Sequence, residues 1–265
     1  MIQPNATFTG PSHYDEALGP VQFDPFARDL VQRVPQGFRG SVLELACGTC
    51  IVTRRLRARL DPAARLVATD LAKAMVDYAR SRDAGGTVEW MEADAMRLPF
   101  EPQTFDLVVC GFGVMFFPDP AAGLREARRV AKPGARLLFN VWDEIERNPH
   151  ALANAQVVEG LFPGDPQMKF RVPYSLADQQ SLRALLVASG WRESRIEVRR
   201  IAIEGADPRR LAEGQIRGTP RSALLAERGL ALEDVIAKVA AALAAQGGDP
   251  YNGSAQAVVV EAEAA

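Results

Sequence analysis

A regular alternation of short apolar runs with helical segments fills residues 41–142 and limits this chain to few folds. The apolar runs are residues 41–46, 65–70, 87–91, 105–110 and 135–142. The helical segments between them are residues 51–60, 72–81 and 120–131, the last of which is opened by Asp119 as N-cap and by Pro120. Apolar strands separated by helices predict an α/β fold whose parallel sheet is covered on both faces.

The pattern changes after residue 142, where helical segments dominate. The expected elements are a helix over 148–162, a helix opened by a capping box at 175–178, a strand over 191–204, two or three helices, and a last strand over 255–261. A parallel sheet that ends in a strand, helices and a strand favours an antiparallel addition at its edge. The chain contains no internal repeat.

Composition excludes several classes of protein. The chain has 265 residues and a formal net charge of −2, which gives no electrostatic footprint for a nucleic acid or an anionic membrane. Three cysteines and two histidines exclude a disulfide framework and leave little material for a metal site, so we expect neither. The N-terminal residues do not resemble a secretory signal, and the longest apolar stretch, Leu107 to Pro118, is too short for a membrane span. We therefore expect a cytoplasmic protein.

Three carboxylates and a glycine turn are expected at one rim of the sheet. The first strand ends near Glu44 and leads into a turn with Gly48, the second strand ends at Asp70, and Asp94 follows the third. Ligands of open parallel sheets bind at the carboxyl ends of the strands. A turn before a helix often binds phosphate, but this turn holds no arginine or lysine and its neighbours are acidic. The rim therefore suits a nucleoside with a cationic tail. Asp70 can accept hydrogen bonds from the ribose hydroxyls, Asp94 can accept one from an adenine amine, and Glu44 can balance the charge of an amine or sulfonium.

Five segments follow one another in order: residues 42–49 (VLELACGT), 67–75 (VATDLAKAM), 92–100 (EADAMRLPF), 105–109 (FDLVV) and 125–134 (REARRVAKPG). Together they resemble the motifs of class I S-adenosylmethionine-dependent methyltransferases, of the small-molecule type similar to the quinone-biosynthesis methyltransferases. The resemblance implies a Rossmann-like, doubly wound sheet of seven strands, mostly parallel with the last strand antiparallel, plus a helical cap. It also implies S-adenosyl-L-methionine as cofactor, S-adenosyl-L-homocysteine as product, and methyl transfer to a small acceptor.

The resemblance also implies which residues contact the cofactor. They are Glu44, Ala46, Gly48, Cys50, Asp70, Leu71, Met75, Asp94, Ala95, Cys110 and Phe112. The family usually has glycine where this chain has Ala46 and Cys50. We expect the helix to begin at Cys50 in ordinary backbone geometry, with the sulfur turned away from the cofactor.

Cys47 and Cys50 also form a Cys-x-x-Cys pattern, which is found in redox and zinc sites. Such a site would need a second cysteine pair, a histidine partner or a thioredoxin-like context. The only other cysteine is Cys110, and neither histidine is near in the sequence. The pattern is therefore a minor alternative to the cofactor role.

Methyl transfer requires a well-placed acceptor and exclusion of water more than any fixed catalytic group. A general base helps only if the acceptor arrives protonated. The residues expected to line the acceptor pocket are Tyr14, Met115, Phe116, Phe117, Trp142, Phe162, Phe170 and Tyr174. An aromatic residue or methionine at such a place is more often part of the core than a substrate contact, but together these residues favour an apolar or aromatic acceptor. His13, His150 and Tyr14 are candidate bases, although both histidines are expected at the surface.

We expect one domain with four parts. These are an N-terminal helical lid segment (1–40), a cofactor-binding half (41–142), cap and substrate-side helices (143–190), and C-terminal strands and helices that complete the sheet (191–265). Two other functions stay open: an enzyme of this fold that keeps the cofactor for another reaction such as a cyclisation, and a non-catalytic cofactor-binding subunit. The acids at positions 44, 70 and 94 argue against the subunit. The sequence specifies neither the acceptor nor the oligomeric state.

Overall fold

The computed structural model describes residues 10–169 and 171–264. Contacts between residues divide them into two compact units. The sheet unit comprises residues 26–143, 172–199 and 257–264. The helical unit comprises residues 10–25, 144–171 without residue 170, and 200–256.

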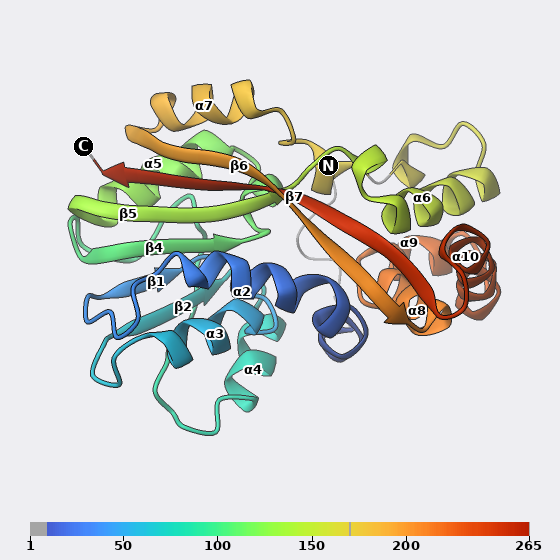
Figure 1. The fold of residues 1–265 in the computed structure, drawn as a ribbon, viewed down its shortest axis with the longest axis horizontal. Coiled ribbons are helices and arrows are strands. Elements are labelled where there is room, and N and C mark those ends of the chain that lie inside the picture. Colours follow the sequence, from blue (N-terminus) through green and yellow to red (C-terminus); the bar gives the residue numbers. More distant parts are fainter. Residues whose placement is uncertain (1–9, 170, 265) are drawn as a thin grey trace. The chain divides into compact units, whose positions relative to one another are not determined.

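The sheet has seven strands in the order β3-β2-β1-β4-β5-β7-β6 (Figure 1). The strands are β1 (Val42–Glu44), β2 (Leu66–Asp70), β3 (Glu89–Glu92), β4 (Phe105–Gly111), β5 (Ala131–Trp142), β6 (Trp191–Ala206) and β7 (Tyr251–Ala264). The first five strands pair in parallel, and β7 runs antiparallel to β5. The expected seven-stranded Rossmann-like fold is confirmed. The expected antiparallel addition at the edge of the parallel sheet is also found, because β7 pairs antiparallel with β5 and β6 lies beyond β7.

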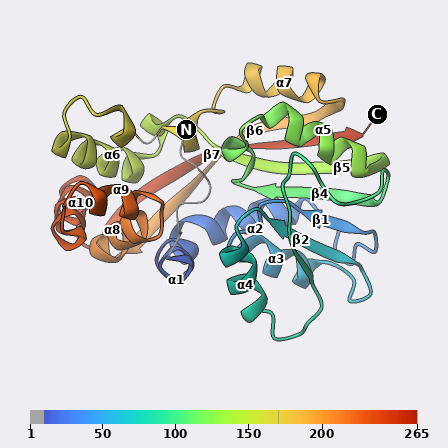
Figure 2. The same cartoon turned by 180° about the vertical axis from the view of Figure 1, so that it is seen from behind.

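Helices cover both faces of this sheet. The helices of the sheet unit are α2 (Asp24–Gln32), α3 (Ile51–Arg59), α4 (Lys73–Ser81), α5 (Pro120–Val130) and α7 (Gln179–Ala188), with the short 3-10 helices η2 (Val114–Phe116) and η5 (Val172–Tyr174). In Figure 1, α2 and α3 lie in front of the sheet, whereas α5 lies in front when the molecule is seen from behind (Figure 2). Leu30 of α2 and Leu56 of α3 join strand residues such as Leu107 in one apolar cluster. This burial holds the amphipathic helices against the sheet.

The start of α7 differs from the capping box expected at Ser175. The N-cap is Asp178, whose carboxylate accepts hydrogen bonds from the backbone N–H groups of Gln180 and Ser181. Ser175 instead donates its hydroxyl to the carbonyl of Val172, at 2.8 Å, within the turn formed by η5. An ionised carboxylate that satisfies two free N–H groups is a strong N-cap, so the helix begins three residues later than expected.

The helical unit contains α1 (Pro11–His13), the π-helix η1 (Tyr14–Phe23), α6 (Pro149–Leu161), α8 (Pro208–Arg217), α9 (Arg221–Glu227) and α10 (Leu232–Gly247), together with η3 (Ile145–Arg147) and η4 (Pro166–Met168). The central helix α8 packs against α10 and η1, and α10 also packs against α6. Buried side chains of α8 and α10, such as Leu211 and Val239, form the apolar contacts. None of the described helices combines the length and the apolar character that a bilayer span requires.

Candidate cofactor and active site

The turn between β1 and α3 is built from backbone in the left-handed region. Ala46 has a φ of +51°, Gly48 of +53° and Cys50 of +68°. The expectation of ordinary geometry at Cys50 is therefore wrong: Cys50 is a left-handed N-cap, and α3 begins at Ile51. Alanine and cysteine adopt this conformation at a cost of about 1–2 kcal/mol each, which glycine avoids.

Backbone hydrogen bonds impose this shape on the turn. The N–H of Cys47 donates to the carbonyl of Thr69 at 2.9 Å, and the N–H of Cys50 donates to the carbonyl of Cys47 at 3.0 Å. The first bond ties the turn to β2, and the second closes it upon itself. The turn is therefore held by the sheet, and its residues must accept the conformation that the sheet requires.

Gly48 lies at the open side of the turn. A Cβ atom placed on Gly48 would meet no heavy atom within 4 Å. The space beside the turn is therefore available to a ligand, and the absence of a side chain lets a ligand approach the backbone closely.

Asp70 ends β2 and faces this turn. Its Oδ2 accepts a hydrogen bond from the N–H of Gly48 at 2.9 Å, and its Oδ1 accepts one from the N–H of Ala72 at 2.9 Å. Burial raises the pKa of Asp70 above its ordinary value, and the backbone N–H groups partly oppose this shift. Each carboxylate oxygen has two lone pairs, so Asp70 keeps capacity to accept from a ligand hydroxyl.

Glu44 is the most perturbed acid of the rim. Its side chain is 1% exposed, and its Oε2 has no hydrogen-bond partner among the described residues. Burial raises the pKa of Glu44 to about 8, the charge of Asp70 adds to this, and the neighbouring Thr53 lowers it in part. A buried carboxyl with an unsatisfied oxygen is costly unless a ligand completes it. A cationic group beside Glu44 would favour the ionised form and satisfy that oxygen.

The remaining acids and apolar side chains of this rim follow β2 and β3. Asp94 accepts a hydrogen bond at 2.8 Å from the N–H of Met96 and is partly buried. Leu71 is 48% exposed although it is apolar, whereas Met75 and Ala95 are partly buried. These residues provide a hydrogen-bond acceptor and an apolar surface beside Asp70, and this combination fits a nucleoside base.

The segment after β4 closes the other side of the turn. A Cβ atom on Gly113 would lie 2.6 Å from both the Cβ of Ala46 and the Sγ of Cys110, so the two segments touch. Phe112 has a φ of +54°, and its N–H donates to the side-chain oxygen of Asn140 at 2.9 Å. Asn140 was not among the residues singled out by sequence reasoning. Its signal was a lone polar residue within the apolar run of β5.

The three cysteines are buried and form no disulfide with one another. Burial raises the pKa of Cys47 well above its usual value and that of Cys110 to about 12. Because the thiolate is the reactive and metal-binding form, these two thiols are unreactive at neutral pH. The Sγ of Cys50 accepts a contact from the Nη1 of Arg54 at 3.3 Å.

The residues predicted to line the methyl-acceptor pocket fall into three groups. Trp142 stacks on Phe112 with ring centroids 3.9 Å apart, and both meet Phe26 edge-on, so this trio is part of the buried core. Met115 and Phe116 belong to η2, which packs against η5 and so approaches Tyr174. Phe116 is 52% exposed, whereas Met115 is buried.

The other predicted acceptor residues lie elsewhere. The ring of Phe117 occupies the space in which a Cβ on Gly123 would fall. Tyr14 and Phe162 belong to the helical unit, where Tyr14 stacks on Phe23 with centroids 4.5 Å apart. Phe170 lies outside the described residues.

The two histidines differ in their surroundings. His13 is exposed, as expected, and its Nδ1 lies 3.6 Å from Oε1 of Glu213. His150 is 1% exposed, so the expectation of a surface residue is wrong. It lies in the first turn of α6 and is covered by its neighbours in the helical unit, and burial lowers its pKa to about 4.

Comparison with known proteins agrees with this site. A model of the methyltransferase domain matches residues 43–139. A demethylmenaquinone methyltransferase of Mycobacterium sp. (strain JLS) is 41% identical over 189 residues, which cover 68% of this chain and 78% of that protein. A 2-phytyl-1,4-naphtoquinone methyltransferase of Thermosynechococcus vestitus is 39% identical over 104 residues, covering 39% of this chain and 45% of the relative. Against several such relatives, the chain matches only about half of their length.

A solved structure shares the whole fold. The crystal structure of a SAM-dependent methyltransferase from Aquifex aeolicus superimposes with a TM-score of 0.57 at 17% identity, covering 96% of this chain and 98% of that one. The chain therefore belongs to the class I S-adenosylmethionine-dependent methyltransferase family. Within this family it is similar to the quinone-biosynthesis methyltransferases.

Proposed function

We propose that this chain transfers a methyl group from S-adenosyl-L-methionine to a small apolar or aromatic acceptor by in-line displacement. The observation that carries the proposal is the buried carboxyl of Glu44, whose Oε2 has no hydrogen-bond partner in the described part of the chain, next to an open turn at Gly48. The site fits the cofactor because it offers acidic groups and open backbone where the cofactor is cationic and bulky. When bound, the cofactor supplies an electrophilic methyl group on a sulfonium.

Each residue at the rim has a distinct task in this proposal. Glu44 balances the positive charge of the methionine portion, Asp70 accepts from the ribose hydroxyls, and Asp94 accepts from the adenine amine. Leu71 and Met75 provide apolar contact for the base, and Leu71 is exposed as such a role needs. The turn residues 46–50 supply backbone that a ligand can approach. Cys110 and Phe112 support the turn from the neighbouring strand end, since Gly113 brings their segment against Ala46.

The acceptor surface is proposed to include η2 and η5 of the sheet unit. Phe116 and Tyr174 come from these two contacting elements, and the half-exposed ring of Phe116 is available to an apolar partner. The relatives are named for quinone acceptors, 2-phytyl-1,4-naphtoquinone in one and demethylmenaquinone in the other. We therefore propose an aromatic ring as the acceptor, with no nucleic acid or membrane required and with a cytoplasmic place of action. No general base is assigned, and the suggested roles of His13, His150 and Tyr14 stay predictions.

Labelled cofactor tests the activity. The purified chain is incubated with methyl-labelled S-adenosyl-L-methionine and a panel of quinols, phenols and aliphatic amines. We expect label in quinols or phenols, and loss of transfer in Glu44→Gln. The matched control is Asp77→Asn, which removes an exposed acid of α4 and should leave transfer unchanged. Absence of any binding of S-adenosyl-L-homocysteine at millimolar concentration would refute the proposal, whereas binding without transfer to any acceptor would favour a cyclase or a non-catalytic subunit.

A further inference from the structure

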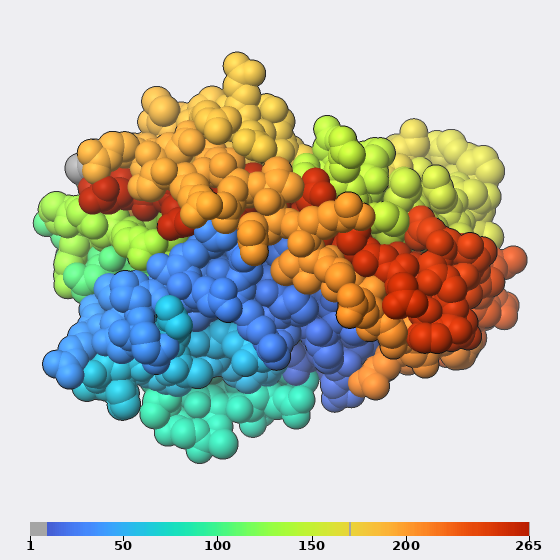
Figure 3. Space-filling view, viewed as in Figure 1, coloured from blue at the N-terminus to red at the C-terminus, as the bar shows by residue number. Residues whose placement is uncertain are grey.

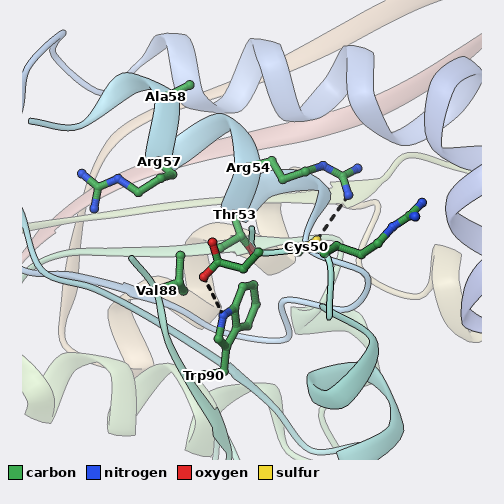
Figure 4. Close-up of a pocket in the computed structure, with 9 residues that line it drawn as sticks. Cys50, Thr53, Arg54, Arg57, Ala58, Val88 and Trp90 are labelled. Carbon is green, nitrogen blue, oxygen red and sulfur yellow. Dashed lines mark hydrogen bonds between the residues drawn. The ribbon is translucent and has the colours of Figure 1, made fainter. Parts of the chain in front are cut away.

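A cavity lies in the sheet unit beside α3 (Figure 4). It has a volume of about 300 Å³. Cys50, Thr53, Arg54 and Arg57 line it from the α3 side, and Val88 and Trp90 line it from β3 and the connection before β3. This volume is at the lower end of the range for small-molecule sites. Of the residues predicted to contact the cofactor, only Cys50 lines this cavity.

The cavity combines positive charge with an apolar wall. Three arginines line it, Arg54, Arg57 and Arg82, against one acid, Asp83. The carboxylate of Asp83 is engaged by the indole N–H of Trp90 at 3.1 Å. Helix α3 itself carries four arginines and no acid, which is an unusual concentration in a chain of net charge −2.

The guanidinium of Arg57 is held in place by neutral groups. It donates to the carbonyl of Ala64 at 2.9 Å and to the carbonyl of Asp61. These bonds orient the side chain through uncharged backbone oxygens, and the charge of Arg57 also interacts with the nearby Asp61 carboxylate. An oriented guanidinium is well suited to bind phosphate, sulfonate or carboxylate, because its planar fork matches their oxygens. The flat indole of Trp90 and the side chain of Val88 suit an apolar or aromatic body.

We propose that this cavity binds a small anion with a flat apolar body, such as an aromatic phosphate, at a site separate from the cofactor. The anionic group lies on the arginines of the cavity, and the apolar body lies against Trp90 and Val88. The aromatic part contributes through apolar burial, so the intact ligand binds more tightly than phosphate alone.

Arg54 connects this cavity to the turn beside Glu44. Its Nη1 lies 3.3 Å from the Sγ of Cys50 and 3.5 Å from the carbonyl of Thr49, and Figure 4 shows the contact with Cys50. Cys50 is held in the left-handed conformation. An anion that draws Arg54 towards the cavity removes these contacts and changes the turn. Binding at the cavity therefore alters cofactor affinity, and the cofactor alters affinity at the cavity by the same factor. This coupling rests on the proposed function, whereas binding at the cavity does not.

The binding is tested with 1-naphthyl phosphate, titrated by calorimetry into the full chain. 1-Naphthol and inorganic phosphate serve as the neutral and the non-aromatic probe. We expect 1-naphthyl phosphate to bind at least tenfold more tightly than either. Equal affinity for inorganic phosphate, or no binding of 1-naphthyl phosphate, would overturn the proposed ligand class.

Two variants locate the site without removing the structural bonds of Arg57. Ala58→Glu places an acid in the cavity from an exposed position of α3, and Arg82→Gln removes one cation from an exposed position. We expect Ala58→Glu to weaken the binding of 1-naphthyl phosphate at least tenfold and Arg82→Gln to weaken it about threefold. The matched control is Ala241→Glu, at an exposed position of α10, which should bind as the unchanged chain does. Unchanged affinity in Ala58→Glu, with the chain folded by circular dichroism, would show that the probe binds elsewhere.

The coupling is measured as the affinity for S-adenosyl-L-homocysteine with and without saturating 1-naphthyl phosphate. We expect a change of threefold or more, and its loss in Arg54→Gln. If the affinity for S-adenosyl-L-homocysteine is the same with and without 1-naphthyl phosphate while both ligands bind, the proposed coupling is wrong but binding at the cavity is not contradicted. If S-adenosyl-L-homocysteine does not bind while 1-naphthyl phosphate does, the proposed function fails and the cavity stands.

Discussion

The carboxylate of Asp70 accepts a hydrogen bond of 2.9 Å from the backbone N–H of Gly48, so one side chain joins the end of β2 to the turn after β1. The same carboxylate accepts from the N–H of Ala72, which precedes α4. Asp70 therefore shapes the pocket as well as offering an acceptor to the ligand. A substitution there alters both properties together.

We expect Asp70→Ala to weaken the binding of S-adenosyl-L-homocysteine by at least tenfold, because charge-assisted hydrogen bonds contribute about 1.5–3 kcal/mol each. Asp70→Asn should also weaken binding, since an amide cannot accept at both of the positions that now face N–H groups. Calorimetry measures both affinities. Asp77→Ala, an exposed acid of α4, is the control that should bind normally. An unchanged dissociation constant in Asp70→Ala would mean that the ribose lies elsewhere.

Glu44 should release a proton when the cofactor binds. Its pKa of about 8 in the free protein lies above the ordinary value of 4.5, so it is largely protonated at pH 7. A cationic amine or sulfonium beside it lowers this pKa and drives the proton out. Binding should therefore strengthen as pH rises from about 6 to 8. Calorimetry of S-adenosyl-L-homocysteine binding in Bis-Tris and in Tris, two buffers of different ionisation enthalpy, measures the release from the difference in observed enthalpy.

The stability of the ligand-free protein depends on pH in the opposite direction to cofactor binding. A carboxyl whose pKa is raised on folding contributes stability that is complete below about pH 4.5 and is lost as pH rises through 8. The ligand-free protein should thus lose stability over this range, and Glu44→Gln should remove this contribution and the proton release together. A binding enthalpy that is independent of the buffer would contradict the assignment of Glu44.

Sequence reasoning located the sheet and the acids because both depend on local patterns. Continuous apolar runs predicted β1 to β5 and their helices to within a few residues, and residues at the ends of parallel strands must share one edge. The insertion of β7 between β5 and β6 could not be predicted in this way, because strand order depends on long-range pairing. Burial of His150 likewise depends on the packing of the helical unit, which its local sequence does not reveal.

The turn at 46–50 shows a subtler limit. Glycine usually marks a left-handed residue, so alanine and cysteine at positions 46 and 50 did not themselves indicate that conformation, although the family usually has glycine at both. The sheet imposes the shape through the hydrogen bond from Cys47 to Thr69, and the residue type follows at an energetic cost. Asn140 was overlooked for a related reason: a single polar residue in an apolar strand acquires meaning only when its partner, the N–H of Phe112, is known.

Ala46→Gly should stabilise the protein. A left-handed alanine destabilises the folded state by about 1–2 kcal/mol, which glycine avoids. The greater freedom of glycine in the unfolded chain lowers this gain by about 0.4–1 kcal/mol. The free energy of unfolding, measured with urea, should therefore rise by roughly 0.5–1 kcal/mol. The control is Ala74→Gly, within α4, which should lose roughly 0.5–1 kcal/mol because its backbone is helical. Destabilisation in both variants to the same degree would show that Ala46 is not strained.

Cys50→Gly separates strain from the role of the thiol. It relieves the same left-handed conformation but removes a buried side chain and its contact with Arg54, so its gain in stability should be smaller than that of Ala46→Gly. Binding of S-adenosyl-L-homocysteine should be as tight or tighter, because glycine lets the backbone approach the ligand. Loss of all methyl transfer with binding intact would instead assign the Cys50 thiol a part in the reaction.

His150 should make the protein sensitive to acid. Its pKa is lowered on folding from 6.5 to about 4, because burial disfavours the charged imidazolium. Its contribution to stability is therefore present above pH 6.5 and is lost as pH falls from 6.5 towards 4, by a total of roughly 3 kcal/mol. Urea unfolding at a series of pH values measures this slope. His150→Leu should flatten it between pH 4 and 6.5, whereas His13→Leu, at an exposed position, should leave it unchanged. If His150→Leu and the unchanged chain lose stability in parallel over this range, the acid sensitivity arises from other groups.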